Sequence, residues 1–145
     1  MPHDAKRHTP VINPSALPCP CGRVAGKKSL TFADCCARYL DHFTTIAAPD
    51  AESLMRSRYS TFVLNRPDYL AATWHLTTRP ANLSADSGTR WLGLEVRAHR
   101  LIDADHAEVE FVARYRLAGR GARIHERSRF VREGGRWFYV DGDLY

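Results

Sequence analysis

The sequence lacks several features that define large classes of protein. Its 145 residues contain no apolar run that approaches the roughly 20 residues of a membrane-spanning helix. The N-terminal stretch carries charges and prolines without a continuous apolar segment, which is unlike a secretory signal. It also has no internal repeat, no glycine-rich phosphate loop, no H-E-x-x-H motif and no convincing Ser/His/Asp order. We therefore expect a cytoplasmic protein without a membrane span.

Cysteine is absent outside one short window, "CPCGRVAGKKSLTFADCC". Structural disulfides are uncommon in the cytoplasm, and a redox dithiol needs only two cysteines, most often as C-x-x-C. Four closely spaced cysteines instead match the ligand set of a structural zinc site. We predict that Zn²⁺ is bound by Cys19, Cys21, Cys35 and Cys36, with redox chemistry as the alternative. His42 is a less favoured ligand, because four thiolates already fill the coordination shell.

Three basic residues lie inside this window, namely Arg23, Lys27 and Lys28. A zinc ion with four thiolate ligands has a net charge near −2, which these side chains could offset. They are also the residues that we predict to bind a protein partner. The zinc itself is expected to be structural, because a closed shell of four cysteines leaves no position for water or substrate.

The composition is that of a soluble globular chain. Hydrophobic residues make up 44% and charged residues 26%, which argues against disorder. The length suggests one compact domain with a small appendage. The formal net charge of +5 permits binding to nucleic acid or an anionic surface. Because the arginines alternate with acidic residues, a solvated mixed surface is the simpler interpretation.

Two helices are expected in the middle of the chain. Asp50 is a good N-cap for the first, Glu52 lies in its first turn, and Asn65 can take the left-handed conformation that ends it. Pro67 suits the first turn of the second. The predicted inner faces are Met55, Tyr59, Phe62 and Val63 for the first helix, and Tyr69, Leu70, Thr73 and Trp74 for the second.

After a predicted loop at 76–89, the periodicity changes from that of a helix to that of a strand. Four strands are expected, at 90–102, 106–117, 123–132 and 136–142, joined by links short enough for hairpins. Helices first and an antiparallel meander afterwards predict an α+β fold, with the helices packed on one face of the sheet.

The motifs "CPCG", "GKK" and "CC" together resemble the SEC-C motif, a zinc knuckle best known from the tail of the SecA protein translocase. The pieces "LMRSRYS" and "GGRWFYVDG", with the rest of the chain from about Cys19 to Gly142, resemble the uncharacterised bacterial YchJ-type family. The resemblance implies a knuckle followed by a cone-shaped α+β domain (cystatin-like) similar to nuclear transport factor 2 (NTF2). It implies no established activity.

This resemblance gives the expected organisation: a flexible N-terminal arm at 1–18, a zinc knuckle at 19–42 and an NTF2-like domain at 43–145. The chain departs from the family pattern in two ways. Cys21 and Cys35 are separated by 13 residues rather than about eight, and Arg23 stands where serine is usual. Extra loop length adds little to the entropy of closure, so the metal site is expected to persist.

A pocket at the wide end of the cone is the second predicted site. On the third strand, Glu126 and Ser128 alternate onto the apolar face, and the cavity could also be lined by Trp74, His75, Trp91 and Tyr139. In an enzyme, Glu126 or His75 would be the general acid or base. The favoured alternative makes Glu126 the buried ion-pair partner of Arg56 or Arg58, fixing helix against sheet.

The opposite face of the third strand carries a basic stripe: Arg123, His125, Arg127 and Arg129. Cross-strand pairs with Glu108 and Glu110 would explain it without nucleic acid, so binding to nucleic acid or the ribosome is not favoured. The leading hypothesis is a non-enzymatic protein whose zinc knuckle binds a protein partner, with the cone as scaffold or small-ligand binder. The alternative is an enzyme or small-molecule-binding protein that uses the cone pocket.

Overall fold

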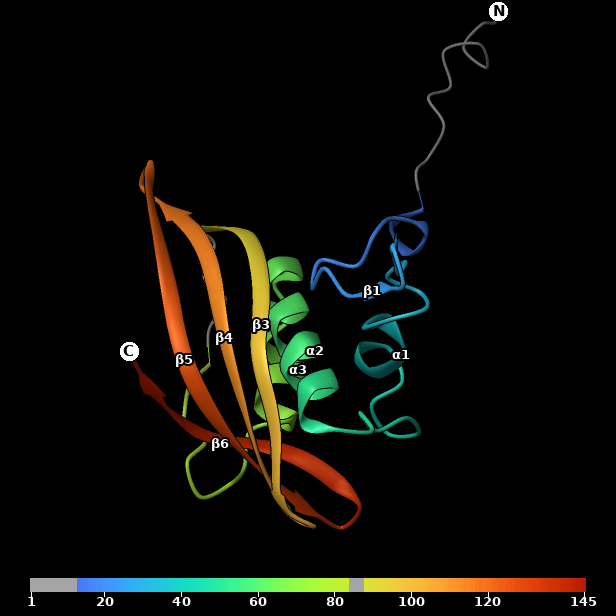
Figure 1. Ribbon diagram of the computed structural model, residues 1–145, viewed down its shortest axis with the longest axis vertical. Helices are drawn as coiled ribbons and strands as arrows, with labels where there is room; N and C mark the ends of the chain where they lie inside the picture. The colour runs from blue at the N-terminus through green and yellow to red at the C-terminus, as the bar shows by residue number, and fades with distance from the viewer. Residues whose placement is uncertain (1–12, 84–87) are drawn as a thin grey trace, which may run out of the picture.

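The computed structural model describes residues 13–83 and 88–145. A curved antiparallel sheet wraps around helices α2 and α3, and the cysteine-rich segment lies on the other side of α2 (Figure 1). The helix α2 is therefore a middle layer between the sheet and the knuckle. Most of the predicted N-terminal arm lies outside the described residues. Its last part is not free, because the carbonyls of Ser15 and Leu17 accept hydrogen bonds from Ala33 and Phe32.

The helix α2 spans Ala51–Leu64 and has the predicted ends. The side chain of Asp50 accepts a hydrogen bond of 2.7 Å from the backbone N–H of Ser53, as an N-cap does. Asn65 ends the helix in the left-handed conformation, with φ of 60°. The short helix α3, Pro67–Ala72, begins with proline as predicted.

The sheet is a meander in which neighbours in sequence are neighbours in space, in the order β3-β4-β5-β6. Its strands are β3 Thr89–Asp103, β4 His106–Leu117, β5 Arg120–Glu133 and β6 Arg136–Leu144. Register shifts interrupt the pairing of β3 with β4 at three places, and such bulges bend and twist a sheet. The predicted α+β fold is confirmed, and each of the four predicted strands forms.

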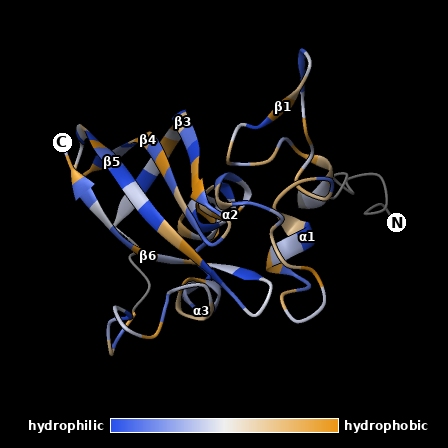
Figure 2. Ribbon diagram, turned by 60° about the horizontal axis from the view of Figure 1, so that its bottom comes forward, coloured by the Kyte–Doolittle hydropathy of each residue, from blue (hydrophilic) through white to orange (hydrophobic). Residues whose placement is uncertain are grey.

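One part of the core lies between α2 and the concave face of the sheet, and the same cluster continues into the knuckle through Phe32, Tyr39 and Leu40. Val109, Phe111 and Ala113 of β4 are buried in the first part, as their alternation with polar residues predicts. Figure 2 shows this alternation of polar and apolar residues along the strands. The predicted inner face of α2 is correct for Met55 and Tyr59, which are buried.

Phe62 also lies on the inner face, where it lines a cavity and packs 5.4 Å from the Trp91 ring, although it is 42% exposed. The prediction is wrong for Val63, which is 38% exposed and does not line this cavity. The reason is that α2 is covered from two sides. Its buried residues follow both contact faces and include Ser53, Ser57 and Ser60. A single apolar stripe therefore does not describe this helix.

The knuckle contains a two-stranded hairpin, with β1 at Val24–Ala25 and β2 at Lys28–Ser29, and a short helix α1 at Ala37–Leu40. The hairpin occupies the long stretch between Cys21 and Cys35. Its turn uses Gly26 at φ of 64°, a conformation that glycine adopts without steric strain. The additional residues thus form a projecting hairpin. No helix in the described residues is long and apolar enough to cross a membrane.

Candidate metal centre and cavity

The four cysteines converge at the base of the knuckle. Their Sγ atoms all lie within 4.8 Å of one another, and all four side chains are buried. The Sγ atoms of Cys21 and Cys35 are 3.6 Å apart, and those of Cys35 and Cys36 are 4.0 Å apart. A tight turn brings the first pair together, in which the N–H of Gly22 donates to the carbonyl of Cys19.

This donor set fits a tetrahedral ion. With Zn–S bonds of about 2.3 Å, a regular tetrahedron has S···S edges of about 3.8 Å, close to the separations found here. All four cysteines are free rather than joined in disulfides. His42 does not belong to the cluster, and within the described residues no other metal-binding group of this kind occurs.

The charge of the cluster also indicates a cation. Hydrogen bonds from the other three thiols lower the pKa of Cys19, whereas hydrogen bonding with Cys19 and Cys21 raises the pKa of Cys35 and of Cys36. The effect of Cys19 on the pKa of Cys21 is to raise it, but hydrogen bonds from Cys35 and Cys36 outweigh this effect and lower that pKa to about 7. Thiolates therefore form most readily at Cys19 and Cys21, whereas those at Cys35 and Cys36 need a compensating positive charge. A divalent metal supplies that charge and favours four thiolates.

Side chains of α2 hold the cysteine cluster against the cone. The hydroxyl of Ser60 lies 3.6 Å from Cys19 Sγ, within hydrogen-bonding distance for sulfur. Arg56 donates a hydrogen bond of 3.0 Å to the carbonyl of Cys21 and pairs with Glu52 at 2.9 Å. These contacts orient the cysteine segment from the helix side.

The predicted partner-binding residues separate into two groups. Arg23 donates a hydrogen bond of 2.8 Å to Ser53 and lies 3.9 Å from Glu52, so it faces the protein's own helix α2. This internal contact leaves the Arg23 side chain 29% exposed, and its predicted contact with a partner stays a prediction. Lys27 and Lys28 lie at the turn of the hairpin and are exposed.

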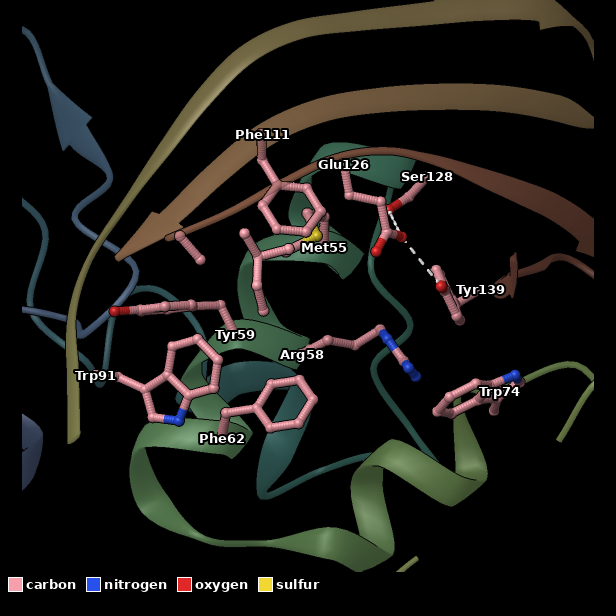
Figure 3. Close-up of a pocket in the computed structure, with 12 residues that line it drawn as sticks. Met55, Arg58, Tyr59, Phe62, Trp74, Trp91, Phe111, Glu126, Ser128 and Tyr139 are labelled. Atoms are coloured by element: carbon pink, nitrogen blue, oxygen red, sulfur yellow. Dashed lines mark hydrogen bonds between the residues drawn. The ribbon is translucent and has the colours of Figure 1, made fainter. Parts of the chain in front are cut away.

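A cavity of about 340 Å³ lies between α2 and the concave face of the sheet (Figure 3). Five of the six predicted residues line it: Trp74, Trp91, Glu126, Ser128 and Tyr139. The lining residues that the sequence reading did not assign to a pocket include Met55, Arg58, Tyr59, Phe62, Phe111 and Ile124. The walls are mainly aromatic and aliphatic, as in small-molecule sites of comparable size.

His75 was predicted to line this cavity and does not. The segment after α3 runs beside β6, where Trp74 bridges to Tyr139 and the N–H of His75 donates to the carbonyl of Tyr139. Successive side chains of an extended segment point to opposite sides, so Trp74 points inward and His75 outward. The His75 ring contacts Thr77 at 2.7 Å and Glu133 at 3.0 Å.

The predicted buried ion pair between Glu126 and an arginine is also wrong. Arg56 pairs with Glu52, on the other side of α2. Arg58 donates to the carbonyl of Leu70 and to Thr73 Oγ1, at 3.0 and 2.6 Å. Glu126 is half-buried, and its Oε2 accepts hydrogen bonds from Ser128 at 2.6 Å and Tyr139 at 3.0 Å.

Arg58 is nevertheless deeply buried, with 5% of its surface exposed. Its guanidinium lies between two aromatic rings, 5.0 Å from the centroid of Trp74 and 4.5 Å from that of Tyr139. Burial lowers the pKa of Arg58 to about 10, so the group keeps its charge at neutral pH. Burial, with the nearby Glu126 carboxylate, raises the pKa of Tyr139, so its hydroxyl remains a donor.

Gly142 is a part of this site that the sequence analysis missed. It pairs with Ser128 across β5 and β6. A Cβ atom at this position would lie 2.1 Å from Glu126 Oε2. The carboxylate therefore lies against the bare backbone of β6, and a side chain there would displace it.

The basic stripe on the outer face of β5 is largely neutralised by neighbouring acids. Arg129 pairs with Asp141 and Asp143 of β6 at 2.6 and 2.8 Å, and Arg127 pairs with Asp143 at 3.1 Å. Cross-strand ion pairs therefore occur on this stripe, with β6 as the partner of these two arginines. The predicted role of Glu108 is wrong, because Glu108 pairs with Arg100 of β3 at 2.9 Å. His125 pairs with Glu110 at 2.7 Å, as predicted for β4.

Fold and sites together define an NTF2-like α+β domain that carries a four-cysteine knuckle at its N-terminal side. The family described as "YchJ, middle NTF2-like domain" matches residues 50–142. The chain belongs to this YchJ-type family, as its sequence motifs indicated.

Relatives named UPF0225 protein support this assignment. One from Polaromonas naphthalenivorans is 61% identical over 88% of this chain and 98% of its own length. One from Methylibium petroleiphilum is 58% identical over 99% of this chain and 96% of its own.

Two solved structures share the fold. A SEC-C motif containing protein from Psychrobacter arcticus superposes with a TM-score of 0.75 at 32% identity, over 91% of this chain and 85% of that one. A second SEC-C motif containing protein, from Rhodopseudomonas palustris, has a TM-score of 0.75 at 30% identity, over 89% of this chain and 99% of that one.

Proposed function

We propose that this protein is a small-molecule-binding protein whose knuckle is held on the cone by one structural Zn²⁺. The observation that carries the proposal is the cavity of about 340 Å³, in which polar groups converge within mainly apolar walls. A cone that served only as a scaffold would have its interior filled by side chains. The proposed role is binding without catalysis.

The zinc would be held by Cys19, Cys21, Cys35 and Cys36 and would order a segment that is too short to form a core of its own. A closed shell of thiolates supplies charge and rigidity and no open position for substrate. The hydroxyl of Ser60 and the guanidinium of Arg56 would fix the bound segment against α2. Four free thiols also suit a reducing compartment, which supports a cytoplasmic location.

A titration with naphthylmethanol, a neutral and largely apolar probe, tests the binding function. We expect saturable changes in the amide spectrum that are confined to residues around the cavity. Ala113 is buried and lines the cavity, so Ala113→Phe should fill the space and abolish the changes. Ala98→Phe adds the same ring at an exposed position of β3 and should leave binding intact. Saturation that Ala113→Phe does not affect would contradict the proposal.

A second function is supported by the shape of the knuckle. The hairpin of β1 and β2 projects away from the body and carries exposed Lys27, Lys28 and Val24 (Figure 2). We propose this hairpin as the surface that binds an acidic protein partner. Affinity capture with the wild type and with Lys27→Glu/Lys28→Glu would test it. Partners retained equally by both would exclude the hairpin as the binding surface.

A further inference from the structure

The cavity contains one positive and one negative side chain that do not pair with each other. No ion pair within 4.0 Å joins Arg58 and Glu126, although both line the cavity. Each is instead held from behind by neutral groups. Arg58 is anchored by the end of α3, and Glu126 by two hydroxyls of the sheet.

Both anchored groups keep hydrogen-bonding capacity for a third molecule. The two hydrogen bonds accepted by Glu126 from described residues go to Oε2, which leaves Oε1 as an acceptor. The hydrogen bonds of Arg58 to Leu70 and Thr73 use Nη1, which leaves Nε and Nη2 as donors. In the described part of the chain, the buried polar side-chain atoms without a partner are Trp74 Nε1 and Arg127 Nε. Nε and Nη2 of Arg58 are not among these buried atoms, and Arg58 lines the cavity, so both donors are accessible to a ligand there.

The charges constrain the ligand. Arg58 and Glu126 sum to zero within a mainly apolar space, so a ligand with a net charge would leave one charge uncompensated at low dielectric. A ligand with two full charges would have to lose the hydration of both. A neutral group with one acceptor and one donor satisfies both side chains and leaves no uncompensated charge.

We propose that the ligand of this cavity has an apolar, aromatic-sized body and a neutral amide-type head, whose carbonyl accepts from Arg58 and whose N–H donates to Glu126. The proposal rests on the small-molecule-binding function given above and specifies its chemistry. Primary amides, ureides and lactams share this donor and acceptor pair. The body would lie against Tyr59, Phe62, Trp91 and Phe111, which line the same cavity.

Three probes with one body test the head group: naphthylacetamide, naphthylacetate and naphthylethylamine. The first is neutral with donor and acceptor, the second is an anion, and the third is a cation. We expect the full-length protein to bind naphthylacetamide at least about tenfold more tightly than either charged probe, because hydrogen bonds to charged groups are lost with the wrong head. Titrations followed by amide spectra give the three dissociation constants.

Glu126→Gln should change the preference among the three probes. It leaves the buried Arg58 in place, so the test does not require a variant that could fail to fold. The substitution raises the net charge of the cavity by one, so the ratio of naphthylacetate to naphthylacetamide affinity should rise by about tenfold or more. Glu95→Gln makes the same substitution at a carboxylate of β3 that is 49% exposed and does not line the cavity, and should change nothing.

The outcomes separate the two proposals. If naphthylmethanol and the naphthyl probes all fail to bind, both the binding function and the ligand class are wrong. If the probes bind in the cavity but naphthylacetate or naphthylethylamine is preferred, the binding function stands and the amide-type head is wrong. A preference for naphthylacetamide that Glu126→Gln leaves unchanged would also overturn the proposed contact.

Discussion

The knuckle and the cone reach a folded state by different physical means. The cone has long strands and buries large apolar residues such as Val109, Phe111, Phe130 and Trp137. The knuckle has strands of two residues and a helix of four, and its most deeply buried residues are cysteines. Apolar burial can stabilise the first part, whereas the second is too small for that and depends on the proposed metal.

The two parts share the helix α2, and its two faces differ accordingly. Met55 and Tyr59 face the cavity and the sheet. Ser53 and Ser60 contact the knuckle through a hydrogen bond and a sulfur contact. Small polar residues allow the cysteine segment to approach closely and tolerate water when it leaves. The cone should therefore survive loss of the knuckle, whereas the knuckle should not survive loss of the metal.

The largest effect is expected from Cys21→Ser. Structural zinc contributes about 10–16 kcal/mol of apparent binding free energy in small zinc domains, and loss of a ligand removes much of it. We expect elemental analysis to show loss of zinc and amide spectra to show loss of structure at residues 19–40, while β3 to β6 persist. Val24→Ala, at a position that is 54% exposed in the same hairpin, should retain the metal. Retention of zinc by Cys21→Ser would refute the four-cysteine site.

High pH should destabilise the cone, and acid should destabilise the knuckle. Burial raises the pKa of Tyr59 and of Tyr69 to about 12 in the cone. Both tyrosines stabilise the fold fully below their unfolded pKa of about 10, and this contribution is lost as pH rises through about 12, by roughly 2–3 kcal/mol each. In mild acid the thiolates protonate and release metal instead. Strand signals lost in acid before those of the knuckle would contradict this order.

A smaller effect is expected where the cysteine cluster contacts α2. Ser60→Ala removes the hydroxyl beside Cys19 Sγ and should weaken zinc binding by about 10- to 100-fold, without loss of the cone. Ser57→Ala is the matched control on the same helix. Its hydroxyl contacts Tyr69 and the carbonyl of Leu54, so this change should lower stability by about 1 kcal/mol and leave metal affinity unchanged. Competition with a chromophoric chelator measures both.

The smallest effect on stability is expected at Glu126. Because no arginine pairs with it, Glu126→Gln should change the free energy of unfolding by no more than about 1 kcal/mol. Gly142→Ala should displace the carboxylate from Ser128 and Tyr139 and lower the affinity for naphthylacetamide more than it lowers stability. Thermal unfolding of Glu126→Gln distinguishes the hydrogen bonds to Ser128 and Tyr139 from a buried ion pair. Loss of a buried ion pair would lower stability by about 3–5 kcal/mol.

The sequence predicts the elements of this fold well because their signals are local. Asp50 and Asn65 mark the ends of α2, and alternation marks β4. The cysteine cluster is also readable, since its residues are close in the chain. The burial of Ser53, Ser57 and Ser60 on α2 could not be predicted, because a serine packed between two layers cannot be distinguished by sequence from a serine exposed to solvent.

Features that depend on distant contacts could not be read in the same way. The position of Arg58 between Trp74 and Tyr139 combines three elements, and nothing local distinguishes it from Arg56 two residues earlier. His75 is turned outward by the pairing of its segment with β6. The place of Gly142 beneath Glu126 follows from the register of β5 and β6.

The most direct test of the proposed division is hydrogen exchange on the full-length protein, purified without oxygen, before and after removal of metal by a chelator. One zinc per chain is expected at the start. Chelation should remove protection from residues 19–40 and leave it in β4 and β5, whose pairing does not involve the knuckle. Protein that contains no zinc, or strands that lose protection together with the knuckle, would contradict the account.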